Sequence, residues 1–199
     1  FFADDSGSAS LQYAMYGILG NSPETFLLKH RVTRAKFIRG NLSGCFRIPT
    51  GLFSLPCLEI LVVRGIGITR LPEAFGKAKS LRVLDLSYNQ FTDIPEVILK
   101  LPRLSALNMS HNQLKSLPAR LGRLKRLRIL NLKGNEIDSI STDWHRLQNL
   151  RIIDLSMNRI KEVPDVIRTL VSLNEIRLSY NDMSASTEAL WERRISQEA

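Results

Sequence analysis

Residues 81–112 read LRVLDLSYNQFTDIPEVILKLPRLSALNMSHN, and one pattern begins twice within them. The second copy starts 23 residues after the first, since 104 − 81 = 23. The matching pairs are Leu81 and Leu104, Leu84 and Leu107, Leu86 and Met109, and Asn89 and Asn112. The same spacing continues to Leu127, Leu150 and Leu173, and back to Leu58. A fixed period of this length indicates an array of stacked repeats rather than one compact globule.

The fourth and sixth residues of each repeat are apolar and two positions apart, which is the alternation of a strand with one buried face. An asparagine follows where the chain leaves the strand, and its amide can both donate and accept hydrogen bonds. We therefore expect the stacked asparagines to satisfy backbone groups of their own turn and of adjacent turns. They are Asn89, Asn112, Asn135, Asn158 and Asn181. In the copy at 58–80, Ile66 takes this place.

The second half of each repeat supplies further apolar residues, and a proline often precedes them. Proline suits a loop that enters a short helix, so this half predicts short helices or irregular turns. These prolines are Pro72, Pro95, Pro118 and Pro164. Ser141 replaces the proline of one repeat, and we expect that repeat to depart from its neighbours here. Trp144 occupies the slot of Leu121 and is predicted to lie in the core.

Three segments follow from these patterns. Residues 1–31 predict an N-terminal helical cap, although they can also be interpreted as a separate helix pair that binds a partner. Residues 32–183 predict about seven repeats, of which the first is degenerate and the last is truncated. Residues 184–199 change period and predict a C-terminal helical cap. Helical caps would cover the apolar ends of the array.

The repeats resemble the leucine-rich repeat family over about residues 32–183, with the pattern LPxxIxxLxxLxxLxLSxN. Their 23-residue length resembles the intracellular class found in Ras-pathway scaffolds and Scribble-like proteins. The resemblance implies an α/β horseshoe-shaped solenoid with a parallel β-sheet on its concave face and the short helices or turns on its convex face. It also implies that the chain binds proteins. The flanks lack the cysteine-rich caps of secreted members, which favours the cytoplasm or nucleus.

The concave face is the expected docking surface for a protein partner, because it carries tyrosine and arginine, which are favoured in binding hot spots. A competing interpretation is that its branched residues are simply good strand formers. The predicted partner-binding residues are Arg82, Asp85, Tyr88, Asn108, His111, Asn131, Lys133, Arg151, Asp154, Met157, Arg177 and Tyr180.

The chain is basic, with a formal net charge of +9. Such a charge permits nucleic acid, an acidic protein or an anionic membrane surface as a partner. A run without acidic residues contains a candidate basic patch, formed by Arg120, Arg123, Lys125 and Arg126. The patch could contact phosphates or an acidic partner, but a solvated helix face is the preferred interpretation. Nucleic acid is the less favoured partner, because no stacking aromatics interleave with the charges.

Nothing in the sequence supports catalysis. His30, His111 and His145 are scattered and follow no metal-ligand spacing. We therefore predict a non-enzymatic interaction module without a cofactor, monomeric in isolation. No apolar run reaches the ~20 residues of a membrane span. Two alternatives stay open: the substrate-recognition domain of a larger effector enzyme such as a ubiquitin ligase, and a peripheral subunit of a ribonucleoprotein or cytoskeletal assembly.

Overall fold

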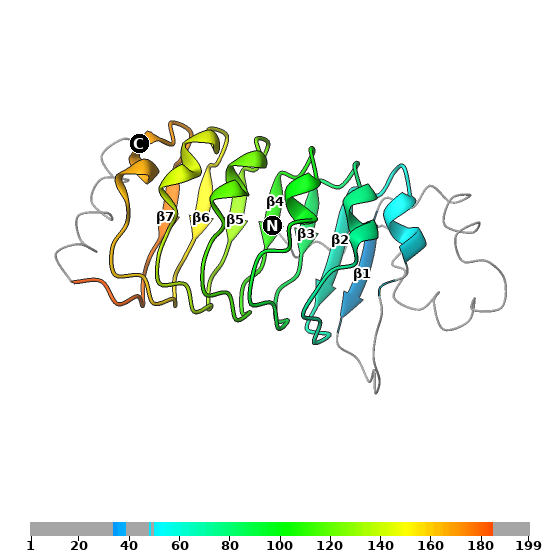
Figure 1. Ribbon diagram of the computed structural model, residues 1–199, viewed down its shortest axis with the longest axis horizontal. Coiled ribbons are helices and arrows are strands. Elements are labelled where there is room, and N and C mark those ends of the chain that lie inside the picture. Colours follow the sequence, from blue (N-terminus) through cyan, green and yellow to red (C-terminus); the bar gives the residue numbers. More distant parts are fainter. Residues whose placement is uncertain (1–33, 39–47, 49, 185–199) are drawn as a thin grey trace.

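A computed structural model describes residues 34–38, 48 and 50–184 of the chain. These residues form one open sheet of seven parallel strands, which follow one another in sequence order (Figure 1). The strands are β1 (Arg34–Ile38), β2 (Ile60–Arg64), β3 (Val83–Asp85), β4 (Ala106–Asn108), β5 (Ile129–Asn131), β6 (Ile152–Asp154) and β7 (Glu175–Arg177). The predicted helical caps at 1–31 and 184–199 lie outside the described residues, except for Ser184.

The sheet pairs equivalent positions of successive repeats. From β2 onward, each residue lies opposite the residue 23 positions later, as Leu61 lies opposite Leu84 and Leu84 opposite Leu107. Between β1 and β2 the offset is 26, because Arg34 lies opposite Ile60. The same offset separates Val32 from Leu58 in the sequence. The 23-residue period therefore sets the register of the sheet from β2 to β7.

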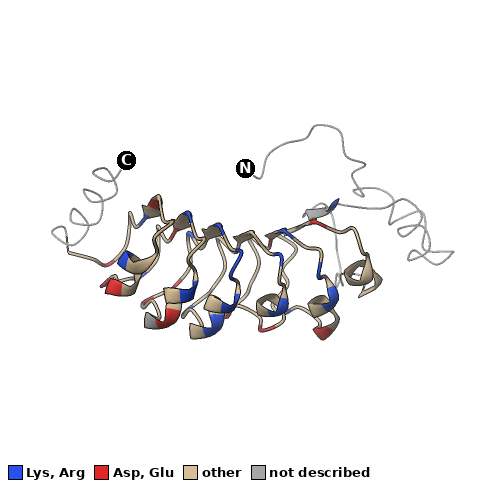
Figure 2. Cartoon of the chain, turned by 90° about the horizontal axis from the view of Figure 1, so that it is seen from above, with Lys and Arg blue, Asp and Glu red and all other residues tan. Residues whose placement is uncertain are grey.

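Short 3-10 helices form the other side of the solenoid. They are η1 (Thr50–Ser54), η2 (Glu73–Lys77), η3 (Ile98–Lys100), η4 (Ala119–Arg123), η5 (Thr142–Arg146) and η6 (Asp165–Thr169). Viewed from above, the sheet lines the concave side and these helices follow the convex side (Figure 2). The predicted α/β solenoid, with a parallel sheet on its concave face and short helices on its convex face, is confirmed.

The core lies between the sheet and the 3-10 helices. Strand residues such as Leu84 and Leu107 are fully buried, and so are the apolar residues of the convex half, including Leu121 and Trp144. The prediction that Trp144 belongs to the core is confirmed. The expectation that its repeat departs from its neighbours is wrong, because the Ser141 hydroxyl accepts a hydrogen bond from the Asp143 N–H and starts η5 in place of proline.

The stacked asparagines join successive turns, as expected. The Asn112 side-chain amide donates to the Met109 carbonyl of its own turn and to the Leu86 carbonyl of the preceding repeat, both at 3.0 Å. Its oxygen accepts the Phe91 N–H at 3.1 Å. Asn89, Asn135, Asn158 and Asn181 repeat this geometry. Each asparagine therefore serves both its own turn and the turn of the repeat before it.

Candidate functional site

A row of residues lies just beyond the carboxyl ends of the strands and turns large side chains toward solvent. Its members are Gly65, Tyr88, His111, Gly134, Met157 and Tyr180. All six have a positive φ, from 54° to 67°, although four of them are not glycine. The described residues contain four large exposed hydrophobic side chains, and three of them are in this row: Tyr88 at 48%, Met157 at 46% and Tyr180 at 81% exposure. We call this set the edge row.

Three side chains of neighbouring repeats stack along the edge row. The Arg64 guanidinium carbon lies 4.4 Å from the centroid of the Tyr88 ring. The rings of Tyr88 and His111 stack with centroids 4.4 Å apart and an interplanar angle of 22°. Burial, followed by the positive charges of Lys133 and Arg64, lowers the pKa of His111 below its ordinary value. The neutral imidazole is thus favoured, and the stack presents a flat surface with one cation at its end.

The next member of the row, Gly134, leaves room for the His111 ring. A Cβ atom at Gly134 would lie 2.7 Å from His111 Nδ1, and its φ of +67° already disfavours a side chain. At Gly67, with a φ of +76°, a Cβ atom would meet nothing closer than 3.9 Å. The two glycines therefore share the backbone requirement and differ in the contact.

We expect Gly134→Ala to lower the free energy of unfolding by about 1–2 kcal/mol from its left-handed backbone, plus the cost of displacing His111. Gly67→Ala should show the backbone cost alone. Urea midpoints for both variants, with near-ultraviolet circular dichroism to follow the Tyr88 stack, check the difference. Equal losses would show that the His111 contact carries no energy.

Three of the predicted partner-binding residues do not face solvent as expected. Asp85 is 2% exposed, and Asn108 and Asp154 are also buried. Each side chain folds back to accept the N–H of the residue two positions later, as Asp85 does from Ser87 at 2.9 Å. These residues close the end of the strand, so their side chains are not exposed on the concave face as the prediction of a binding surface there required.

The other predicted residues of the concave face lie on its surface or at half-buried positions. Arg82, Arg151, and Arg177 are exposed, whereas Asn131 and Lys133 are half-buried. Arg82 forms an ion pair with Glu59 at 3.6 Å. Arg177 Nε lies 2.5 Å from Glu175 Oε1, and its Nη1 lies 3.7 Å from Asp154. The structure brings Tyr88, His111 and Lys133 together, and adds Arg64, which was not among the predicted residues.

The candidate basic patch is partly neutralised by an acidic residue of the preceding repeat. Glu96 Oε1 lies 3.4 Å from Arg120 Nη1 and 3.0 Å from Arg123 Nη1. Lys125 and Arg126 are exposed beyond them. The run lacks acidic residues in sequence, but the stacking of repeats supplies one. Arg146 also lies beside Arg120 and Arg123 in a convex pocket, and it was not predicted.

The described residues contain no group of three or more histidine, cysteine or acidic side chains arranged to hold a metal ion. Within the same ranges, no helix has the length and hydrophobicity needed to cross a membrane.

Two stretches of the chain, 56–114 and 125–183, match the sequence profile named Leucine rich repeat, and residues 102–144 match a second profile that describes two copies of the repeat. The first profile covers more than half of the sequence. The chain therefore belongs to the leucine-rich repeat family. Domains of this family generally mediate protein–protein interactions, and the fold is typically non-enzymatic.

Two solved structures illustrate the fold. A leucine-rich repeat protein of Leptospira interrogans is 26% identical to this chain, with a TM-score of 0.68. The match covers 77% of this chain and 38% of the Leptospira protein. The ectodomain of the plant membrane receptor kinase GASSHO1/SCHENGEN3 from Arabidopsis thaliana, in complex with CASPARIAN STRIP INTEGRITY FACTOR 2, is 31% identical with a TM-score of 0.62. That match covers 79% of this chain and 19% of the ectodomain. A comparison with curated proteins gave no significant match.

Proposed function

We propose that this chain binds a protein partner on its concave face and that the edge row makes the central contacts. One observation carries the proposal: the row places large side chains in solvent at positions where the backbone favours glycine. Tyr88, Met157 and Tyr180 are exposed there with a φ near 60°. Gly65 and Gly134 show that glycine fits the same position.

A large side chain in the left-handed region costs about 1–2 kcal/mol per residue. The stack with Arg64 and His111 offsets part of this cost for Tyr88. Met157 and Tyr180 are exposed and gain little hydrophobic stabilisation in return, so the fold alone does not account for them. Strained backbone of this kind is concentrated at functional sites, and exposed aromatic residues are favoured anchors of interfaces. The receptor kinase ectodomain, whose structure was solved in complex with CASPARIAN STRIP INTEGRITY FACTOR 2, is a similar fold that holds a partner.

The Arg64–Tyr88–His111 stack gives this surface its chemistry. A flat aromatic face with a cation at one end fits an apolar or aromatic side chain of the partner beside an acidic group. Asp85 and Asp154 are buried, so neither offers its carboxylate for direct contact with a partner on this face. Lys133 adds a further positive charge next to His111.

The test compares concave and convex variants with an intact, tagged chain. Partners captured from a lysate are first identified by mass spectrometry, and the dissociation constant of the purified partner is then measured. We expect Tyr88→Ala with Tyr180→Ala to weaken binding by about tenfold or more, because hot-spot residues typically carry most of the binding energy. Both side chains are exposed, so circular dichroism should show an unchanged fold.

The matched convex variant replaces Arg120, Arg123 and Arg126 by glutamate. We expect it to bind the same partner within a few fold of the wild-type chain. A partner that stays bound to the tyrosine variant and is lost from the arginine variant would place the docking surface on the convex side.

A further inference from the structure

The convex side carries a row of basic residues that repeats with the array, visible along the 3-10 helices in Figure 2. The same place in four consecutive repeats is basic: Lys77, Lys100, Arg123 and Arg146. Two of these side chains pair with a glutamate 27 positions earlier in the sequence. Lys100 Nζ lies 3.6 Å from Glu73 Oε2, and Arg123 Nη1 lies 3.0 Å from Glu96 Oε1. Adjacent repeats are therefore joined by ion pairs at a regular offset.

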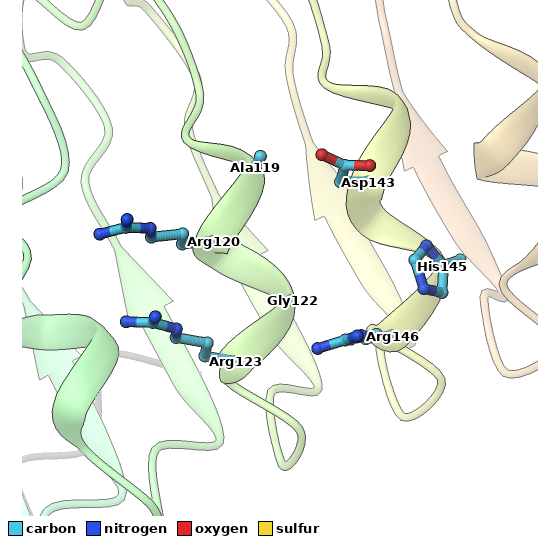
Figure 3. A pocket seen from close by; sticks show the side chains of 7 residues that line it. All are labelled: Ala119, Arg120, Gly122, Arg123, Asp143, His145 and Arg146. Carbon is cyan, nitrogen blue, oxygen red and sulfur yellow. The ribbon is translucent and has the colours of Figure 1, made fainter.

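This pairing stops at Arg146. The residue 27 positions earlier, where a glutamate would stand, is the exposed Ala119, since 146 − 119 = 27. In the described part of the chain, no carboxylate forms an ion pair with Arg146. Figure 3 shows Arg146 pointing from η5 toward η4, in the way that Arg123 points from η4 toward the preceding repeat. The arginine is thus oriented as in a paired repeat, but its internal acid is absent.

A pocket of about 350 Å³ lies at this place, between η4 and η5 (Figure 3). Its lining residues are Ala119, Arg120, Gly122, Arg123, Asp143, His145 and Arg146. Gly122 allows the two helices to approach closely, because a Cβ atom there would lie 3.2 Å from Arg146 Cβ and 3.4 Å from the Asp143 carbonyl oxygen. This close packing places Arg146 at the wall of the pocket.

We infer that this pocket binds the carboxylate of a glutamate or aspartate from an acidic segment of another protein. The incoming carboxylate takes the place that Glu73 and Glu96 hold in the two earlier repeats. Arg146 is the main contact, since a guanidinium can hold a carboxylate through two parallel hydrogen bonds. Arg120 and Arg123, which Glu96 already engages, add a positive field rather than direct bonds.

The same pocket is poorly suited to a nucleic acid backbone. Asp143 lies at the far end of η5 from Arg146 (Figure 3), and its charge would repel a second phosphate next to the first. The carboxylates of an acidic segment sit on separate, flexible side chains, so one can reach Arg146 while its neighbours turn away from Asp143. The partner is therefore an acidic protein segment, and this surface is separate from the edge row on the concave side.

The decisive variant is Ala119→Glu, which restores the missing internal acid without removing any arginine. The probe is a fluorescent polyglutamate peptide, followed by anisotropy on the full chain at low salt, with polyglutamine as the uncharged comparison. We expect Ala119→Glu and Arg146→Ala each to weaken polyglutamate binding by about tenfold, because the new glutamate would occupy the Arg146 guanidinium and the alanine would remove it. Ala119→Gln introduces a side chain of the same shape as glutamate but without its charge, and this variant should bind polyglutamate within about twofold of wild type.

A second control accounts for the net charge of the chain. Lys161→Gln removes one positive charge at an exposed residue outside the pocket, and it should leave polyglutamate binding within about twofold. Loss of binding with Lys161→Gln or Ala119→Gln equal to that with Ala119→Glu would overturn the proposal. The proposal would also be overturned if a single-stranded oligonucleotide bound more tightly than polyglutamate and Ala119→Glu abolished that binding. This result would assign the pocket to phosphate.

Discussion

Asn89→Ala should destabilise the chain by about 3 kcal/mol or more, and by more than the same change at Asn112. In the asparagine ladder, four backbone carbonyls each accept two side-chain amides, one from the asparagine of their own turn and one from the asparagine of the next repeat. They are the carbonyls of Leu86, Met109, Leu132 and Leu155. The Val63 carbonyl accepts an amide only from Asn89, because Ile66 stands where the second donor would be. Asn89→Ala therefore leaves both this carbonyl and the Ile68 N–H without a side-chain partner.

Asn112→Ala is the matched control. The Leu86 and Met109 carbonyls, to which Asn112 donates, would still accept the amides of Asn89 and Asn135. The main group left without a partner is the Phe91 N–H. We expect the cost of Asn112→Ala to be about 1–3 kcal/mol, as for a single unsatisfied buried group. Adding Ile66→Asn to the Asn89→Ala chain should recover part of the loss, because the new amide would stand three residues after Val63. Urea denaturation of the three chains measures these effects. Equal midpoints for Asn89→Ala and Asn112→Ala would contradict the shared-donor account.

The strands, their register and the core were predictable from the sequence because one spacing governs all three. Leucines two apart must face the same side of a strand, and a constant 23-residue period allows only one pairing of equivalent strands. The asparagine ladder was predictable for the same reason. Its sharing of carbonyls between repeats was not, since that depends on how far apart the stacked turns lie.

The burial of Asp85, Asn108 and Asp154 was missed because alternation predicts only which side of the strand a residue faces. Neighbouring strands place Asp85 opposite Asn108 and Asp154 opposite Asn131, so residues at this position cover one another. A signal was present: a short acidic or amide side chain two residues before a turn serine often accepts the backbone N–H of that serine. Asp85 with Ser87 and Asp154 with Ser156 follow this pattern.

The edge row and the convex pocket carried signals in the repeat register. Gly65 and Gly134 share a position with Tyr88 and His111, which points to a left-handed backbone throughout the row. On the convex side, the recurrence of basic residues every 23 positions includes Arg146 and indicates that it belongs with Arg123. The ring stack and the pocket volume depend on side-chain packing between repeats, which the period alone does not specify.

Trp144 should be the most costly residue to truncate, with Trp144→Ala lowering the free energy of unfolding by about 3–5 kcal/mol. Its side chain is fully buried in the slot that Phe75, Ile98 and Leu121 occupy in earlier repeats. Among the described residues its indole N–H has no hydrogen-bond partner, so its contribution comes from packing and is reduced by an unsatisfied donor.

Trp144→Leu separates these two contributions, because leucine is the residue that the preceding repeat uses in the same slot. It removes the unpartnered N–H, keeps part of the volume, and should cost about half as much as alanine or less. Far-ultraviolet circular dichroism in urea gives both midpoints without relying on tryptophan fluorescence. Equal losses with leucine and alanine would show that only an indole ring fills the Trp144 position well. A smaller loss with leucine would show that the array tolerates exchange between equivalent positions, since each repeat packs mainly against its neighbours.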